Sequence, residues 1–229
     1  MKISDIITES EFDPYAPYDL ASPEHKDIRP IESLADLVPV IKQNCSEILK
    51  CYQQSGEVLY RGIKGAISQT VITGIRDSRK PLQMDAPLHN FLTKVYTHMG
   101  IRAHRGNSIF CTTSRGTAMD WGRAYIVFPK DGWVGSWAAA LPDDYAFYTC
   151  QNIARFWLYR SMPAKDKLNG ASEMVRTELD VQSFDHSTLG GILRKRPIDL
   201  LITGDSYIGV YPTSAPEFTE FLAALGLRK

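Results

Sequence analysis

Apolar residues recur at helical spacing in several parts of the chain. The clearest pattern covers residues 34–52, where Ser33 is a suitable N-cap and Gly56 follows the end. It predicts one amphipathic helix. Weaker or shorter patterns predict further helices over residues 88–99, 115–121, 145–162 and 218–225. Much of the chain is therefore expected to be helical.

Short runs rich in β-branched and aromatic residues predict strands between these helices. They cover residues 57–60, 109–112, 125–128, 198–202 and 207–211. Gly204 and Asp205 separate the last two runs and indicate a hairpin. Residues 64–86, punctuated by glycine and proline, predict an irregular segment. Helices early in the chain and several short strands later predict an α+β fold.

The first part of the chain differs in composition from the rest. Prolines at 14, 17, 23 and 30 stand among many charged residues, which is typical of an extended arm. We therefore expect an N-terminal arm or linker over residues 1–32 and a single domain over residues 33–229, a length that one hydrophobic core can support.

Composition and charge exclude some classes of partner. The 229 residues include 26 basic and 26 acidic side chains, a formal net charge of +0, so no overall attraction to nucleic acid or to an anionic membrane is expected. No signal peptide or membrane-spanning run is visible. The four cysteines are scattered without a metal-binding or disulfide pattern. These features predict a cytoplasmic protein with reduced thiols and no metal.

Two stretches carry the candidate chemistry: Leu59–Gly62 and Ser108–Ser114. The first ends an apolar strand with Arg61 and a glycine. A strand that delivers an arginine to its end presents a fixed guanidinium to phosphate oxygens. The second stretch ends in the hydroxyl residues 112–114, which can contact a sugar. Together they predict a site for a phosphorylated, ribose-bearing ligand, although a surface arginine and a simple helix cap are the structural alternatives.

These motifs resemble those of the arginine-type mono-ADP-ribosyltransferases, a family that includes bacterial toxins and enzymes of tailed phages. The family signature is an Arg, a Ser-Thr-Ser and a Glu-x-Glu on three strands. The resemblance extends over roughly residues 57–211 and implies a split, mostly antiparallel β-sandwich core that binds NAD, with helices at its N-terminal side. In this sequence Arg61 matches the first motif and Thr112-Thr113-Ser114 the second.

The resemblance also implies roles for individual residues. Arg61 would bind an NAD phosphate, and the backbone of Gly62 would meet the nicotinamide amide. The second and third hydroxyls would brace that arginine and the nicotinamide-side ribose. Aromatic side chains nearby offer a face for nicotinamide, although a core role is the alternative and is favoured for Phe128. The implied NAD-binding residues are Arg61, Gly62, Thr112, Thr113, Ser114, Trp121 and Tyr125.

The third motif departs from the family. A carboxylate that grips the ribose 2′-hydroxyl stabilises the positive charge that develops as nicotinamide leaves. The matching position before a late apolar strand is Asp199, one methylene shorter than Glu, and Pro197 replaces the upstream acid. Glu178 and Glu173 are alternatives. We take Asp199, with Arg61 and Ser114, as the catalytic set.

The expected activity is transfer of ADP-ribose from NAD to a host macromolecule, more readily a protein than a nucleic acid, in the bacterial cytoplasm. NAD is the substrate and no metal is needed. A non-catalytic or virion-associated copy of the fold and a plain NAD glycohydrolase are the alternatives. The histidines suggest little more. His89 and His98 have no metal-pair spacing, Asp185 could orient His186, and His104 lies beside two arginines as part of a candidate phosphate surface.

Overall fold

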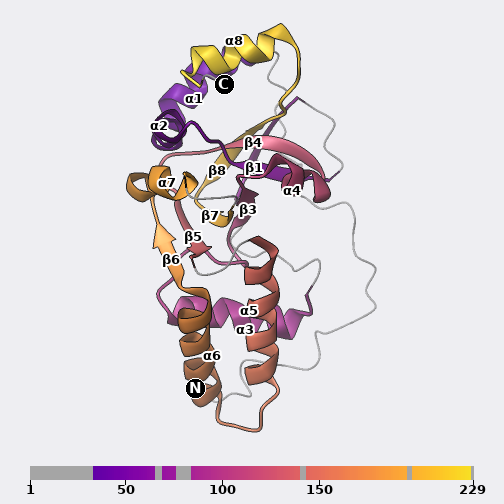
Figure 1. Ribbon diagram of the computed structural model, residues 1–229, viewed down its shortest axis with the longest axis vertical. Helices are drawn as coiled ribbons and strands as arrows, with labels where there is room; N and C mark the ends of the chain where they lie inside the picture. The colour runs from indigo at the N-terminus through magenta and orange to yellow at the C-terminus, as the bar shows by residue number, and fades with distance from the viewer. Residues whose placement is uncertain (1–32, 65–68, 76–83, 140–142, 195–197, 228–229) are drawn as a thin grey trace.

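The computed structural model describes residues 33–64, 69–75, 84–139, 143–194 and 198–227 (Figure 1). The expected arm over residues 1–32 lies outside these ranges. Among the described residues the helices are α1 (Leu34–Asn44), α2 (Ser46–Ser55), α3 (Ala86–His98), α4 (Arg115–Asp120), α5 (Asp143–Leu158), α6 (Ala164–Leu179), α7 (His186–Leu193) and α8 (Pro216–Ala224). The strands are β1 (Tyr60–Ile63), β2 (Thr70–Gly74), β3 (Ile109–Thr112), β4 (Arg123–Pro129), β5 (Val134–Ala138), β6 (Val181–Phe184), β7 (Asp199–Thr203) and β8 (Ser206–Val210).

The strands form one eight-stranded sheet in the order β2-β8-β4-β1-β3-β7-β5-β6. Every described pair of neighbouring strands is antiparallel. The α+β class is therefore confirmed. The join between β1 and β3 is narrow, because Tyr60 with Thr112 is its single register pair. This join separates a half containing β2, β8, β4 and β1 from a half containing β3, β7, β5 and β6.

The longer helices gather in two groups at the two ends of the molecule. At one end of the molecule lie α1, α2 and α8, and at the other lie α3, α5 and α6 (Figure 1). The buried apolar residues correspondingly form two clusters. The larger includes α1, α2, α8 and strands of both halves, and the second joins α3, α5 and α6 to β7 through Leu201. The larger cluster therefore continues across the join between β1 and β3, whereas the second cluster lies on the side of β3 and β7.

The predicted hairpin between residues 198 and 211 is wrong. Although β7 and β8 are consecutive in the chain, β7 pairs with β3 and β5, whereas β8 pairs with β2 and β4. Three strands lie between them in the sheet. Both edges of each strand are occupied by more distant segments, so the turn at Gly204 and Asp205 leads the chain from one half of the sheet to the other.

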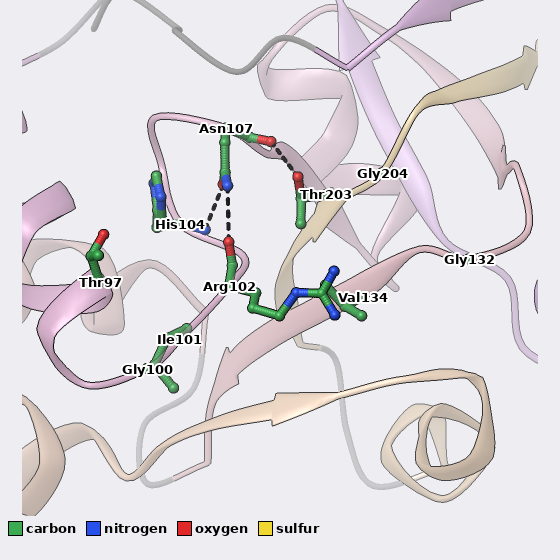
Figure 2. A pocket seen from close by; sticks show the side chains of 10 residues that line it. All are labelled: Thr97, Gly100, Ile101, Arg102, His104, Asn107, Gly132, Val134, Thr203 and Gly204. Carbon is green, nitrogen blue, oxygen red and sulfur yellow. Dashed lines mark hydrogen bonds between the residues drawn. The ribbon is translucent and has the colours of Figure 1, made fainter.

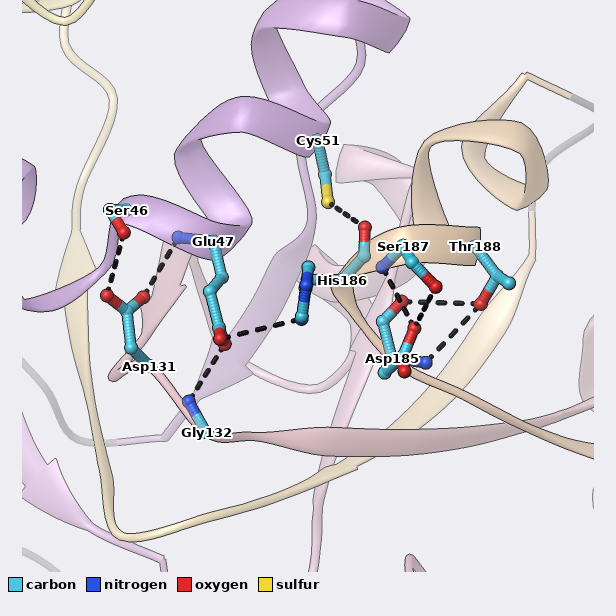
Figure 3. A network of polar contacts seen from close by, with 9 residues as sticks. All are labelled: Ser46, Glu47, Cys51, Asp131, Gly132, Asp185, His186, Ser187 and Thr188. Carbon is cyan, nitrogen blue, oxygen red and sulfur yellow. Dashed lines mark hydrogen bonds and ion pairs between the residues drawn. The ribbon is translucent and has the colours of Figure 1, made fainter.

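The helix expected over residues 34–52 is two helices. Cys45 interrupts it with a φ of −129°, while Ser33 caps α1 and Gly56 ends α2 in the left-handed region, both as expected. A contact from elsewhere in the chain stabilises the break. Asp131 accepts hydrogen bonds from the Ser46 hydroxyl at 2.8 Å and from the backbone N–H of Glu47 at 2.9 Å (Figure 3). Its carboxylate caps the new N-terminus of α2.

The cysteines are all free and buried, in line with the expected reduced thiols. Burial raises the pKa of Cys45 to about 12 and the pKa values of Cys51 and Cys150 to about 11, so these thiols stay protonated at neutral pH. Within the described ranges no group of histidine, cysteine and acidic residues is arranged to hold a metal ion. None of the helices described there combines the length and apolar character needed to cross a bilayer.

Candidate functional site at the join of the two sheet halves

Strands β1, β3 and β7 are neighbours in the middle of the sheet. Tyr60 on β1 lies opposite Thr112 on β3, and Thr112 lies opposite Asp199 on β7. Tyr60, Thr112 and Asp199 thus lie in a line across the three strands, and the first and last are two strand spacings apart, about 10 Å. Arg61 follows Tyr60 directly. The segments that carry the three sequence motifs therefore meet at the narrow join, although they are far apart in the chain.

Arg61 lies inside β1 and not at its exit, because the strand begins at Tyr60, three residues later than expected. Its side chain is 9% exposed. The Nη1 atom donates to the backbone carbonyl of Phe110 on β3 at 3.5 Å, and the guanidinium carbon lies 5.7 Å from the centre of the Tyr207 ring. The guanidinium is thus held between the two halves of the sheet by a carbonyl and an aromatic face.

Beyond the register pair of Tyr60 with Thr112, backbone polar groups of β1 point toward β3. The carbonyl of Leu59 accepts from the N–H of Val127 at 3.0 Å, so alternate residues of β1 bond to β4 and Gly62 directs its N–H and C=O toward β3. On β3 the N–H of Thr113 donates to Ile198 at 3.1 Å, so Phe110 directs its polar groups toward β1 by the same alternation. Polar backbone groups of both strands therefore face each other beside the single register pair.

The missing side chain at Gly62 serves helix packing. A Cβ atom there would lie 2.1 Å from the carbonyl oxygen of Ala118 and 2.7 Å from the Cβ of Trp121. Helix α4 occupies the space that the sequence interpretation reserved for a ligand above the glycine. The expected ligand contact of Gly62 can come only from its backbone edge.

The hydroxyl residues 112–114 all take part in local structure. Thr112 is fully buried and its Oγ1 accepts from the N–H of Ser114 at 3.1 Å. Thr113 Oγ1 accepts from the N–H of Ile198 at 3.0 Å, which attaches the end of β3 to the start of β7. Ser114 Oγ accepts from the N–H of Thr117 at 3.2 Å and caps α4, as predicted. These bonds fix the three hydroxyls at the end of β3, where Thr112 is the register partner of Asp199.

Asp199 is partly buried at the first position of β7. As register partners, Asp199 and Thr112 lie on the same face of the sheet. Alternation along β1 puts the Arg61 side chain on the opposite face from Tyr60, and therefore from Thr112 and Asp199. A ligand that meets both charged groups has to lie at the edge of the narrow join and cannot lie on one face of the sheet.

The alternative carboxylates lie elsewhere. Glu173 and Glu178 are exposed on α6, which lies in the lower half of the view, whereas α4 and β1 lie in its upper half (Figure 1). Asp180 ends α6 in the left-handed region with a φ of 47°. Among the acidic residues considered from the sequence, only Asp199 lies near Arg61.

The aromatic candidates divide between the join and the core. Trp121 is partly exposed and packs edge-on against Phe110, with ring centres 6.4 Å apart. Tyr125 is fully buried and its ring centre lies 5.7 Å from that of Tyr211. Burial raises the pKa of Tyr125. Phe128 is also fully buried and packs against helix residues, as the core interpretation expected.

Three residues near the join were not assigned a role from the sequence. They are Tyr60, which lies across from Thr112, Phe110, whose carbonyl meets Arg61, and Tyr207, whose ring meets the same guanidinium. Burial raises the pKa of Tyr60 while the charge of Arg115 opposes that shift, so its phenol is neutral. Of the three, only Tyr60 could have been found from the sequence, as the aromatic residue directly before Arg61 in the first motif. The other two contacts depend on strand pairing.

His186 has a different partner from the one expected. Asp185 caps α7 by accepting from the N–H of Ser187 at 2.9 Å. The Nδ1 of His186 instead lies 3.5 Å from the Glu47 carboxylate on α2, which also accepts from the N–H of Gly132 at 2.8 Å (Figure 3). This group joins α2, α7 and the start of β5, and its role is structural.

Comparison of the chain with protein-family models, with curated proteins and with solved structures found no match. What the chain does is therefore inferred from its own residues and their geometry.

Proposed function

We propose that the protein is an NAD-dependent mono-ADP-ribosyltransferase whose site lies at the join of β1, β3 and β7. Arg61 binds a phosphate of NAD, Thr113 and Ser114 brace that arginine and the nicotinamide-side ribose, and Asp199 stabilises the cationic ribose. Gly62 meets the nicotinamide amide through its backbone. The finer fold assignment, a split β-sandwich of the transferase type, is part of the same proposal.

The observation that carries the proposal is the adjacency of three motifs on three neighbouring strands. Arg61, the hydroxyl residues and Asp199 come from β1, β3 and β7, which are consecutive in the sheet. A family resemblance based on short motifs requires this adjacency, which the motifs alone do not determine, and its presence supports the proposal. The narrow register between β1 and β3 further agrees with a sheet that is divided at this point.

The reaction needs little more than these groups. The bond between ribose C1′ and the nicotinamide nitrogen breaks, and nicotinamide leaves with the electron pair as a neutral molecule. A nucleophile of the acceptor forms the new bond to C1′ and releases a proton to solvent. Asp199 carries negative charge beside the ribose while C1′ is cationic, and this lowers the barrier because the contact strengthens in the transition state.

A non-catalytic binding protein is the second candidate, and one observation favours it. The position of the family glutamate holds the shorter Asp199, with proline two residues before it. The upstream acid that would activate the acceptor is therefore missing, and plain NAD hydrolysis is the outcome if an active site has no acceptor group.

Incubation with labelled NAD and a bacterial lysate tests the proposal. Label on a macromolecule supports transfer, and treatment with protease or nuclease then identifies the class of acceptor. Free ADP-ribose without labelled acceptor supports hydrolysis. If neither product forms but calorimetry detects bound NAD, the non-catalytic candidate is favoured. If NAD does not bind, the proposal is wrong.

Arg61→Lys is expected to weaken NAD binding by about 1.5–3 kcal/mol, because lysine keeps the charge but loses the bidentate guanidinium geometry. Calorimetric titration with NAD measures the loss, and Arg176→Lys on the exposed face of α6 is the matched control. The melting temperature of each variant shows whether the fold is kept. Unchanged affinity in a folded Arg61→Lys protein would remove Arg61 from the site.

A further inference from the structure

A cavity lies away from the join. It has a volume of about 520 Å³ and is bordered by the end of α3, the segment 100–107, the start of β5 and the end of β7 (Figure 2). Thr203 at the last position of β7 lines it, whereas Asp199 is at the first. Four residue spacings along the strand, about 13 Å, separate the two. The volume is within the range of small-molecule sites.

The charge of this cavity is positive. Arg102 and His104 line it, and no acidic side chain does. The acidic residues next to its wall are engaged elsewhere. Asp205 pairs with Lys130 at 3.0 Å, and Asp131 caps α2. Among the described residues no carboxylate forms an ion pair with Arg102, whose side chain extends along the cavity toward Val134 (Figure 2).

The segment 102–107 is held in one shape by Asn107. Its side chain accepts from the N–H of His104 at 2.9 Å and donates to the carbonyl of Arg102 at 2.9 Å. Its own carbonyl accepts from the hydroxyl of Thr203 at 2.6 Å (Figure 2). The backbone at Arg102 and His104 is therefore fixed to the end of β7 before any ligand arrives, which lowers the entropy cost of ordering this segment on binding.

The hydrogen-bonding groups of the cavity divide into donors and acceptors. The Nδ1 of His104 accepts from the N–H of Gly106 at 3.2 Å, so the neutral ring carries its proton on Nε2 and donates there. Burial lowers the pKa of His104 and favours this neutral form. Thr97 and Thr203 already donate their hydroxyl protons to backbone carbonyls, and each keeps lone pairs that accept. The cavity therefore offers donors to an anion and acceptors to hydroxyl groups.

We propose that this cavity binds a small phosphorylated sugar. The phosphate contacts the guanidinium of Arg102 beside Val134 (Figure 2), since a guanidinium suits phosphate oxygens. Sugar hydroxyls donate to the hydroxyl oxygens of Thr97 and Thr203. The site is separate from the NAD site proposed at the join and does not depend on it.

Calorimetric titration of the whole chain with ribose 5-phosphate, ribose and inorganic phosphate tests this proposal. We expect saturable binding of ribose 5-phosphate, weaker binding of inorganic phosphate and no binding of ribose. Arg102→Gln is expected to weaken ribose 5-phosphate binding about tenfold or more. The matched control is Arg105→Gln, because Arg105 is on the same segment but lies 4.6 Å from the Phe110 ring and outside the cavity lining.

Two further variants make the outcomes decisive. Arg61→Lys is expected to leave ribose 5-phosphate binding unchanged, which separates this site from the proposed NAD site. Thr97→Ala is expected to weaken binding of ribose 5-phosphate but not of inorganic phosphate. The proposal is overturned if ribose 5-phosphate does not bind, if Arg105→Gln weakens it as much as Arg102→Gln, if binding is lost in Arg61→Lys, or if Thr97→Ala changes neither ligand.

Discussion

Asp199→Ala is expected to lower the rate of nicotinamide release about 10²–10³-fold while NAD affinity changes little. The carboxylate contact proposed for Asp199 strengthens only as the ribose becomes cationic, so its loss raises the barrier without weakening the ground-state complex. Nicotinamide release under saturating NAD measures the rate, and calorimetry measures the affinity. Both are needed, because a loss of affinity alone would indicate a binding role.

Asp199→Glu is the informative companion. It restores the longer carboxylate of the family and, if the geometry of the join allows it, should equal or exceed the wild-type rate. Asp205→Ala is the matched control, since Asp205 is exposed and its salt bridge with Lys130 lies at the surface. Wild-type activity in Asp199→Ala would show that the carboxylate lies elsewhere and would contradict the assignment of Asp199. Glu173 and Glu178 are not suitable replacements, because both are exposed on α6, whose buried residues face the second apolar cluster.

The local elements of the site could be predicted from the sequence. The strand Ile109–Thr112 and the cap at Ser114 were predicted correctly, because a β-rich run followed by a capping hydroxyl specifies its own backbone. The break at Cys45 could not be predicted, since it depends on Asp131 from another part of the chain. Local signals locate elements well where the contacts that decide them are also local.

Pairing between distant segments was beyond the sequence. The sequence of residues 198–211 is typical of a hairpin, yet β7 and β8 pair with other strands. Cross-strand side-chain contacts and burial decide strand pairing, and neither is local in the sequence. The strand Thr70–Gly74 was missed inside a glycine-punctuated segment for the same reason, since its partner is β8. The adjacency of β1, β3 and β7 was likewise implied only by the family resemblance. The contacts of Arg61 with Phe110 and Tyr207 follow from that pairing and had no signal of their own.

Gly62→Ala is expected to destabilise the fold by about 3 kcal/mol, the upper part of the usual range for added volume in a packed region. Its Cβ would overlap the carbonyl oxygen of Ala118 at 2.1 Å, and a backbone atom in a capped helix cannot move aside as a flexible side chain does. Helix α4 would have to shift away from β1. Chemical denaturation measures the change in unfolding free energy, and a fall in melting temperature of roughly 10 °C is expected for a chain of this size.

Gly116→Ala within α4 is the matched control. A Cβ there lies 3.8 Å from its nearest neighbour, the Ser114 Oγ, and alanine favours a helix over glycine, so this variant should be stabilised by about 0.5–1 kcal/mol. Opposite signs for the two variants would show that α4 packs against Gly62 as described. Equal stability of Gly62→Ala and wild type would contradict that packing. Because α4 follows Ser114 directly, its displacement should also disturb the hydroxyl residues, and NAD affinity should fall in Gly62→Ala but not in Gly116→Ala.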